Sequence, residues 1–217
     1  MSKMINSIKD PISMVTHLSW AILAIPVTVL LIVFAVLNGG GASYVVSFSI
    51  FGASLILLYT ASTVYHWINI PKFQMLLKRI DHAMIFVLIA GTYTPISLLV
   101  LPTAWGLGIL IAIWSIAIIG IILKLFWITM PRGLGSGIYI AMGWTVVVAI
   151  SPLRQTLLPL GQLLLLGGGI MYTIGGIFYA LKWPPLKFKL WGFHEIFHLF
   201  IMAGSAFHVA LMFIILF

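Results

Sequence analysis

Residues 103–125 read TAWGLGILIAIWSIAIIGIILKL, and this stretch decides the class of fold. Lys124, near its end, is its only charged residue. A transmembrane helix needs about 20 predominantly apolar residues, so the stretch is long enough to cross a bilayer. Strands of a membrane barrel are shorter and alternate apolar with polar residues, which this stretch does not do. The sequence therefore predicts a membrane-spanning helix here.

Six further stretches have the same character, and none of the connections between them exceeds about a dozen residues. We therefore expect an all-α integral membrane protein, with residues 1–217 forming one domain, a seven-transmembrane-helix bundle. The expected helices are Val15–Leu37, Ala42–Trp67, Ile80–Leu101, Thr103–Leu125, Gly133–Ile150, Leu160–Leu181 and Gly192–Phe217.

The composition of the whole chain supports this class and excludes others. Of its 217 residues, 63% are hydrophobic and 6% are charged, and the mean hydropathy is +1.23. Soluble domains carry about 25% charged residues, and disordered chains combine low hydrophobicity with high net charge, so both classes are excluded. The chain has no cysteine, which excludes disulfide bonds and thiolate metal sites.

The basic residues of the connections predict the orientation in the membrane. One side would carry ten of the eleven cations: Lys3, Lys9, Lys72, Lys78, Arg79, Lys124, Arg132, Lys182, Lys187 and Lys189. The other side would carry only Arg154. Because cytoplasmic loops are enriched in Lys and Arg, we expect a multi-pass protein of the cell membrane with a cytoplasmic amino terminus and an external carboxyl terminus. These cations suit anionic lipid headgroups, and no basic domain outside the membrane is expected to bind nucleic acid.

Ionisable residues within the expected helices form one layer near the cytoplasmic face. From a rise of about 1.5 Å per residue, His66 lies about 5 Å, His194 about 4 Å and His198 about 10 Å inside this boundary. Asp81 is expected in the first turn of the third helix, at the same depth. A single histidine in a membrane helix often only hydrogen-bonds a neighbouring helix, but ionisable residues in a membrane are candidates for function, and here several share one depth.

Four other polar side chains are weaker candidates. Ser62 lies one turn deeper than His66 on the same helix face, where it would bond a ligand, a substrate oxygen or its own helix. His17 and His82 are expected in the first turns of their helices, where they would face headgroups. His208 lies about 21 Å further out than His194 and is expected to make a contact between helices.

Three neutral imidazoles with an open fourth position are typical of catalytic zinc, whose fourth ligand is water. A carboxylate nearby can orient this water or accept its proton. The spacing therefore favours a Zn²⁺ site made by His66, His194 and His198, with Asp81 and Ser62 as candidate catalytic residues.

Several short motifs resemble those of the hemolysin III family, in order and along essentially the whole chain. They are Thr16-His17, Ser62-Thr63-Val64-Tyr65-His66, Asp81-His82, Gly91-Thr92-Tyr93-Thr94-Pro95, His194-Glu195-Ile196-Phe197-His198 and His208. This family is similar to the progestin and adipoQ receptors, which include the adiponectin receptors, and more distantly to alkaline ceramidases. In those relatives, one histidine of the second helix and two of the seventh bind zinc near the cytoplasm, and an aspartate of the third holds the metal-bound water. The resemblance implies these roles for His66, His194, His198 and Asp81.

Two functions of different classes fit these residues. One is a zinc-dependent hydrolase of a membrane lipid amide or ester, in which Asp81 orients the water and accepts its proton while Ser62 stabilises the oxyanion. The other is a non-enzymatic receptor-like or membrane-homeostasis protein with structural zinc. An exchangeable water reachable by lipid would favour the first, and a closed coordination sphere the second.

Three further readings have less support in the sequence. The family name suggests a pore-forming cytolysin, but a pore needs polar lining along its length, and the outer two-thirds of the bundle is expected to be apolar apart from hydroxyls, amides and His208. His194-Glu195-Ile196-Phe197-His198 also matches the H-E-x-x-H pattern of metalloproteases, yet Glu195 is turned about 100° from His194 on a helix and no L-D-G motif follows. A transporter would carry its polar sites near the midplane.

The orientation gives the first testable prediction. Reporter fusions after Phe217 should be active only outside the cytoplasm, because ten of the eleven cations fall on the opposite side. A fusion in the Lys72–Arg79 connection is the control and should be active only in the cytoplasm. Activity of the Phe217 fusion in the cytoplasm alone would contradict both the orientation and the depth assigned to the histidines.

Overall fold

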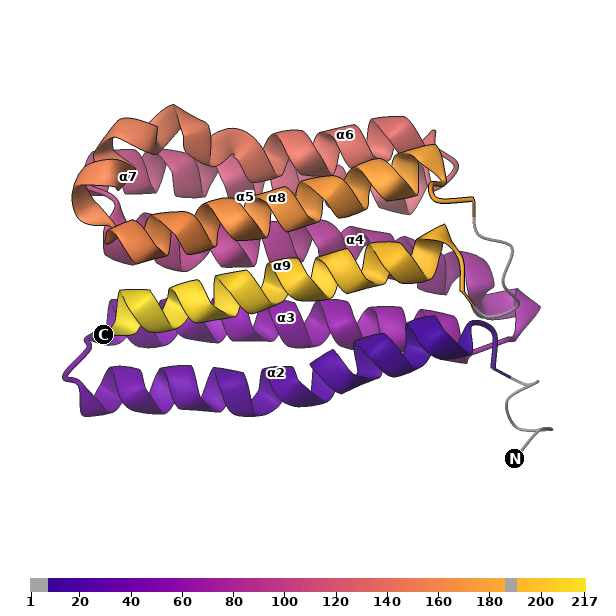
Figure 1. The fold of residues 1–217 in the computed structure, drawn as a ribbon, viewed down its shortest axis with the longest axis horizontal. Coiled ribbons are helices and arrows are strands. Elements are labelled where there is room, and N and C mark those ends of the chain that lie inside the picture. The colour runs from indigo at the N-terminus through magenta and orange to yellow at the C-terminus, as the bar shows by residue number, and fades with distance from the viewer. Residues whose placement is uncertain (1–7, 186–190) are drawn as a thin grey trace.

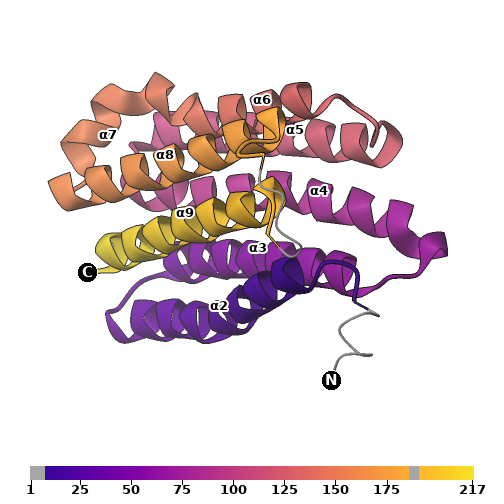
Figure 2. The same ribbon diagram turned by 45° about the vertical axis from the view of Figure 1, so that its right-hand side comes forward.

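The computed structural model describes residues 8–185 and 191–217 as a bundle of helices. Seven helical segments in it are long and apolar enough to cross a membrane, and no strand forms within these two ranges. Figures 1 and 2 show the segments running nearly parallel, with the start of α2 and the end of α9 at opposite ends of the bundle. The predicted all-α, seven-helix membrane fold is therefore confirmed.

The helices follow one another through short connections. Their bounds are α2 (Pro11–Leu37), α3 (Ala42–Trp67), α4 (Pro71–Pro95), α5 (Thr103–Phe126), α6 (Arg132–Gly143), α7 (Ile150–Thr156), α8 (Pro159–Leu181) and α9 (Phe193–Leu216). A π-helix, η1 (Ile96–Val100), continues α4, and a 3₁₀-helix, η2 (Trp144–Ala149), joins α6 to α7. Proline opens α2, α4 and α8, where its fixed φ and missing N–H suit a first turn.

Neighbours in the chain are mostly neighbours in space. α2 packs on α3, α3 on α4, α4 on α5 and α8 on α9, while α2 also packs on α9 and α6 on α8. The segment α9 thus lies between α8 and the α2–α3 pair, as Figure 1 shows. This arrangement brings the start of α9 beside the start of α2 and the end of α3.

The third span begins earlier than the hydropathy predicts. We expected it at Ile80, but α4 begins at Pro71, so Asp81 and His82 lie almost three turns inside the helix and not in its first turn. The added turns carry Lys72, Lys78 and Arg79, and an apolar pattern marks only the part of a helix that meets lipid. The expectation that Asp81 and His82 begin the helix is therefore wrong.

The fifth span differs from the expected Gly133–Ile150 because it is not one continuous helix. It runs from Arg132 to Thr156 with the 3₁₀ segment η2 inside it. The Tyr93 hydroxyl donates to the Gly143 carbonyl at 2.6 Å and accepts from the Val146 N–H at 2.7 Å. Because unpaired backbone groups are costly in lipid, this tyrosine of α4 stabilises the irregular segment.

Among the described residues, the cations are divided between the two ends of the bundle as the sequence predicts. Lys9, Lys72, Lys78, Arg79, Lys124, Arg132 and Lys182 lie toward the amino-terminal end, and Arg154 lies in α7 toward the other. Lys3, Lys187 and Lys189 lie outside the described residues. Which end faces the cytoplasm remains the prediction stated above.

Close packing at glycine provides a test of the bundle. A Cβ at Gly120 of α5 would overlap the Phe86 ring, which is buried in α4, whereas a Cβ at Gly108 of the same helix would meet no heavy atom within 4 Å. We expect Gly120→Ala to destabilise the protein by about 1–3 kcal/mol through overpacking. Gly108→Ala is the matched control and should unfold at the wild-type temperature or slightly above it. Equal thermal unfolding of the two variants in detergent would contradict this packing.

Candidate metal centre

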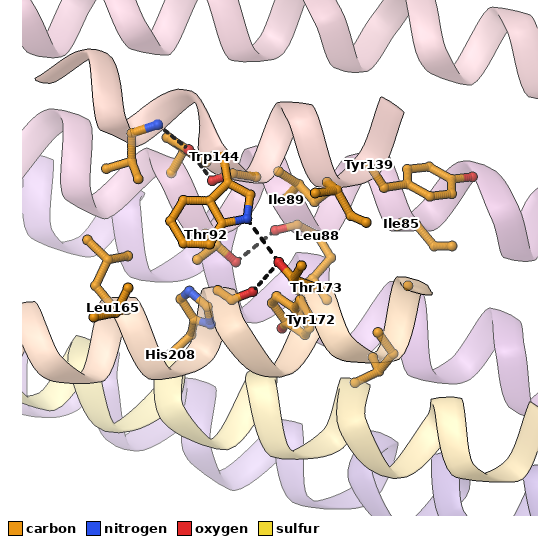
Figure 3. Close-up of a pocket in the computed structure, with 18 of the residues that line it drawn as sticks. Ile85, Leu88, Ile89, Thr92, Tyr139, Trp144, Leu165, Tyr172, Thr173 and His208 are labelled. Carbon is orange, nitrogen blue, oxygen red and sulfur yellow. Dashed lines mark hydrogen bonds between the residues drawn. The ribbon is translucent and has the colours of Figure 1, made fainter. Parts of the chain in front are cut away.

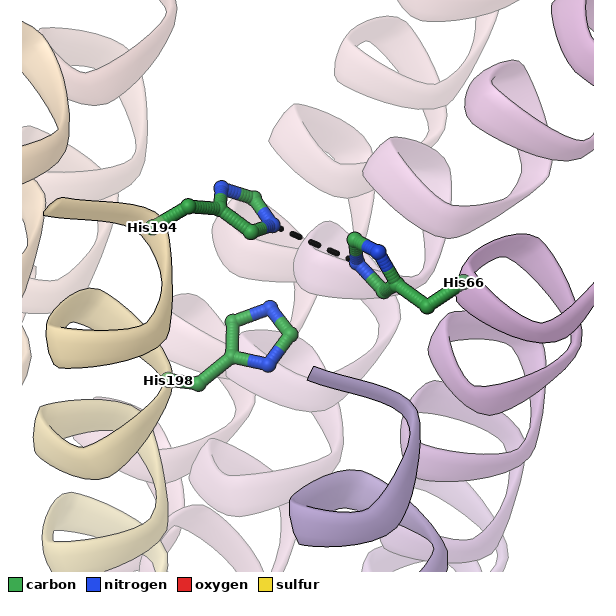
Figure 4. Close-up of side chains that lie close together, drawn as sticks. All are labelled: His66, His194 and His198. Carbon is green, nitrogen blue, oxygen red and sulfur yellow. Dashed lines mark hydrogen bonds between the residues drawn. The ribbon is translucent and has the colours of Figure 1, made fainter. Parts of the chain in front are cut away.

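Three histidines from two helices converge at one end of the bundle. His66 lies in the last turn of α3, and His194 and His198 lie one turn apart at the start of α9. One ligand nitrogen of each lies within 4.8 Å of the others, and the Nε2 atoms of His66 and His194 are 3.2 Å apart. Figure 4 shows the three rings turned toward one another. The structure thus brings together the three residues that the sequence singled out as metal ligands.

The geometry of these nitrogens fits a tetrahedral ion. Zinc–nitrogen bonds of about 2.0–2.1 Å place two ligand nitrogens about 3.3 Å apart, close to the spacing of the His66 and His194 Nε2 atoms. His66 and His198 are buried, and the Nδ1 atom of His198 has no hydrogen-bond partner in the described part of the chain. A buried imidazole nitrogen without a partner is costly, and a metal ion bound there would remove that cost.

A long cavity begins at this cluster. It has a volume of about 590 Å³ and is lined mainly by apolar side chains of α4, α6, η2, α8 and α9. His194, His198, Asp81 and Ser62 line it at the inner end, and Arg154 and Gln162 line it at the other. Figure 3 shows its middle part, between α4, α6 and α8. The outer end is therefore less apolar than the sequence led us to expect, because Arg154 contributes to the lining.

Comparison with known proteins shows the family of the chain. The family described as Haemolysin-III related matches residues 5–209 of the chain. Hemolysin-3 of Bacillus cereus is 42% identical over 207 residues, which cover 95% of this chain and 91% of the relative. The Hemolysin-3 homolog of Bacillus subtilis (strain 168) is 42% identical over 212 residues, which cover 97% and 95%. The chain belongs to the hemolysin III family. No solved structure matches it significantly.

In this hemolysin III protein, the two candidate catalytic residues line the cavity and are not part of the histidine cluster. Asp81 is half-buried and lines the cavity, and within residues 8–185 and 191–217 no hydrogen bond reaches its carboxylate. Ser62 is buried, and its hydroxyl lies 2.8 Å from Nδ1 of His17. His82 lies deeper in α4 than expected, with its Nε2 3.4 Å from the Tyr179 hydroxyl.

His17 belongs to the site, although its position near the start of a helix suggested contact with headgroups. It is buried in α2 and stacks on His198, with ring centroids 3.6 Å apart and planes 9° apart. His17 therefore contacts both Ser62 of α3 and His198, a candidate metal ligand of α9. The sequence signals for it were its depth, about 9 Å inside the boundary, and the Thr16-His17 motif, and neither of them indicated its partners on distant segments.

Glu195, the glutamate of the H-E-x-x-H pattern, is held by two hydrogen bonds. Glu195 accepts a hydrogen bond from the Ser13 hydroxyl at 2.8 Å and from the Gly192 N–H at 2.8 Å. The second bond caps the start of α9, and the first ties α9 to α2. A carboxylate held in this way serves helix capping, so the contacts do not support a protease in which Glu195 is the general base.

Asp10 is the site residue that sequence reasoning missed. Its carboxylate lies 2.8 Å from Nδ1 of His66, and its backbone N–H donates to the His66 carbonyl at 3.0 Å. Burial raises the pKa of the Asp10 carboxyl, but the hydrogen bond from His66 and the positive charge of Lys9 hold it below its ordinary value. The ionised carboxylate only accepts, so Nδ1 of neutral His66 carries the proton and Nε2 presents a lone pair to the cluster.

The sequence signal at Asp10 pointed elsewhere. An aspartate directly before a proline at a helix start is typical of an N-cap, yet the Asp10 side chain makes no capping bond to α2. It contacts His66 instead, 56 residues along the chain. A carboxylate that fixes the tautomer and orientation of a ligating histidine commonly accompanies metal sites.

This contact predicts the effect of removing the carboxylate. Asp10→Ala should weaken zinc binding about 10–100-fold, because His66 would lose the partner that holds its ring and tautomer. Asp10→Asn should lose less zinc affinity, since its amide oxygen can still accept the hydrogen bond from Nδ1 of His66. Affinity can be measured by competition with a chelator, with Lys72→Ala in the first turn of α4 as the control. Wild-type affinity in Asp10→Ala would show that Asp10 does not support the cluster.

Proposed function

We propose that this protein is a zinc-dependent hydrolase of a membrane lipid amide or ester, with its site near the cytoplasmic face. The observation that carries the proposal is the convergence of three histidines, two of which, His194 and His198, line the inner end of a long apolar cavity. A zinc ion bound by His66, His194 and His198 would supply Lewis acidity and lower the pKa of a bound water. The apolar lining beyond it suits a lipid chain.

Each neighbouring side chain has a role in this proposal. Asp81 would orient the attacking water and accept its proton, since its carboxylate lines the cavity without a hydrogen-bond partner among the described residues. The water oxygen would add to the acyl carbon, the bond to nitrogen or oxygen would break, and the proton would pass to the leaving amine or alcohol. Ser62 would donate to the carbonyl oxygen, with His17 positioning its hydroxyl.

A second candidate function is a non-enzymatic receptor-like or membrane-homeostasis protein in which zinc is a structural clamp. Its support is that α3 and α9 meet through few residues, among them Tyr59, whose hydroxyl lies 2.7 Å from the Ser205 hydroxyl, and the histidine cluster. Zinc would join the two helices at one end. In this case Asp81 would have no chemical role.

A cytolytic pore, which the names of the relatives suggest, has less support. A conducting path needs polar groups that are free to replace water. The Thr92 and Thr173 hydroxyls in the cavity donate to carbonyls of their own helices, and Trp144 donates to Thr173. These groups are already paired, so they are not free to replace the water around an ion in the middle of the cavity.

The two leading functions can be separated with purified protein. Wild type should hold about one zinc per chain and release fatty acid from lipid amides or esters in mixed micelles, and His66→Ala should lose most of both. Asp81→Asn should keep its zinc and its unfolding temperature but lose product formation by at least about 10–100-fold, because asparagine cannot accept the proton. Elemental analysis, thermal unfolding and mass spectrometry measure the three properties.

Two outcomes would contradict the proposal. Full zinc retention in a His194→Ala, His198→Ala double variant would remove the metal site. An Asp81→Asn variant equal to wild type in zinc content, stability and turnover would rule out the mechanism. Under the structural clamp, Asp81→Asn would instead preserve every cellular effect of the protein while zinc stays bound.

A further inference from the structure

His208 lies in the outer part of the cavity, far from the histidine cluster, and the mechanism above does not use it. Its Nδ1 atom lies 2.8 Å from the Gly204 carbonyl of the same helix. A carbonyl oxygen only accepts, so Nδ1 carries the proton and Nε2 of the neutral ring is an acceptor. Within residues 8–185 and 191–217 this Nε2 has no hydrogen-bond partner, and His208 is one of the residues that line the cavity.

The ring of His208 is held in place from two sides. It stacks on Tyr172 of α8, with centroids 5.2 Å apart and planes 10° apart, and it lies directly against Gly168, where any side chain would collide with it. The Tyr172 hydroxyl in turn lies 2.9 Å from the Ser205 hydroxyl. The Nε2 acceptor therefore has a fixed position in the cavity and does not depend on a mobile side chain.

The polar side chains around His208 differ from it because their donors are already used. Thr92 donates to the Leu88 carbonyl at 2.8 Å, Thr173 to the Gly169 carbonyl at 2.7 Å, and Tyr93 to the Gly143 carbonyl at 2.6 Å. Figure 3 shows Thr92, Thr173 and His208 together along the cavity. None of these donors faces Nε2 of His208, so an unpaired acceptor lies in apolar surroundings, where lack of a partner is costly.

The position of His208 indicates which part of a bound chain would lie beside it. His208 lies ten residues after His198 on the same helix, and a rise of about 1.5 Å per residue places it about 15 Å along the cavity from the cluster. If the carbonyl group of an acyl chain lies at the cluster, the middle of that chain lies beside Nε2 of His208. A plain alkyl chain would bury this acceptor without a donor, whereas a hydroxyl at that point would satisfy it.

We propose that His208 recognises a hydroxyl group in the middle of the lipid acyl chain, so that the site prefers mid-chain hydroxylated acyl lipids. The proposal rests on the proposed function for the placement of the acyl chain in the cavity. The hydroxyl of the chain donates to Nε2 of His208. Specificity of this kind follows when a buried polar group is paired by one ligand and left unpaired by the other.

Two fatty acids that differ only in this hydroxyl provide the test. Ricinoleic acid carries a mid-chain hydroxyl, and oleic acid is the same chain without it. We expect purified zinc-loaded wild type to bind ricinoleic acid roughly five- to tenfold more tightly than oleic acid, as measured by competition with a fluorescent fatty acid. An acid hydroxylated beside its carboxyl group, 2-hydroxyoleic acid, should show no such gain at this site.

Variants then connect the preference to one side chain. His208→Leu removes the acceptor and should bind the two acids with equal affinity, while retaining its zinc, which lies several turns away. His208→Gln can place an amide oxygen near the position of Nε2 and should keep part of the preference. Thr92→Val, which removes a cavity hydroxyl that is already paired, is the matched control and should keep all of it.

The outcomes distinguish this inference from the proposed function. Equal binding of the two acids to wild type, or a preference that survives in His208→Leu, would overturn hydroxyl recognition and leave the hydrolase proposal standing. Binding of neither acid to wild type would overturn both the acyl-chain cavity and this inference. Loss of the hydrolase reaction in Asp81→Asn with the ricinoleic preference intact would support both.

Discussion

The bilayer core contains no water, and this constraint governs most of the structure. Each backbone and side-chain polar group within it must find a partner inside the protein or bear the cost of having none. Hydroxyls of Thr28, Thr63, Thr92 and Thr94 accordingly donate to carbonyls one turn earlier in their own helices. Among the described residues, His17 Nε2, His82 Nδ1 and His198 Nδ1 are buried without a partner, and all three histidines line the cavity.

The same constraint explains where the helices can depart from regular geometry. The π-helix η1 follows Pro95, and its end is closed by a bond from the Leu101 N–H to the Ile96 carbonyl. The 3₁₀ segment η2 is stabilised by the Tyr93 hydroxyl, which comes from another helix. Irregular backbone is tolerated in a membrane where it lines a cavity or meets protein, and both conditions hold here. Ile96 of η1 and Trp144, Val146 and Val147 of η2 line the cavity.

The candidate metal centre depends on contacts among three segments that are distant in the chain. Asp10 precedes α2, His66 ends α3, and His194 and His198 begin α9. Hydrogen bonds from His66 to Asp10 and from Ser13 to Glu195 hold these segments at one end of the bundle. The chemistry proposed for the site therefore depends on the start of α2 as much as on the residues that would touch the metal. Stability and function are linked at this end, because the same bonds fix the helix ends and the histidine rings.

The sequence by itself determined the membrane class, the seven spans and the choice of His66, His194 and His198, because hydropathy and helical spacing are local properties of a chain. It misplaced the start of α4 and missed the break in the fifth span, since polar turns outside lipid and a tyrosine from another helix leave no apolar pattern. Only the tertiary structure decided that Asp10 serves His66 instead of capping α2, and that His17 meets Ser62 and His198. It also decided that Asp81 lines the cavity without being part of the cluster. Such pairings depend on how helices rotate against one another, and that rotation is set by packing between segments far apart in sequence.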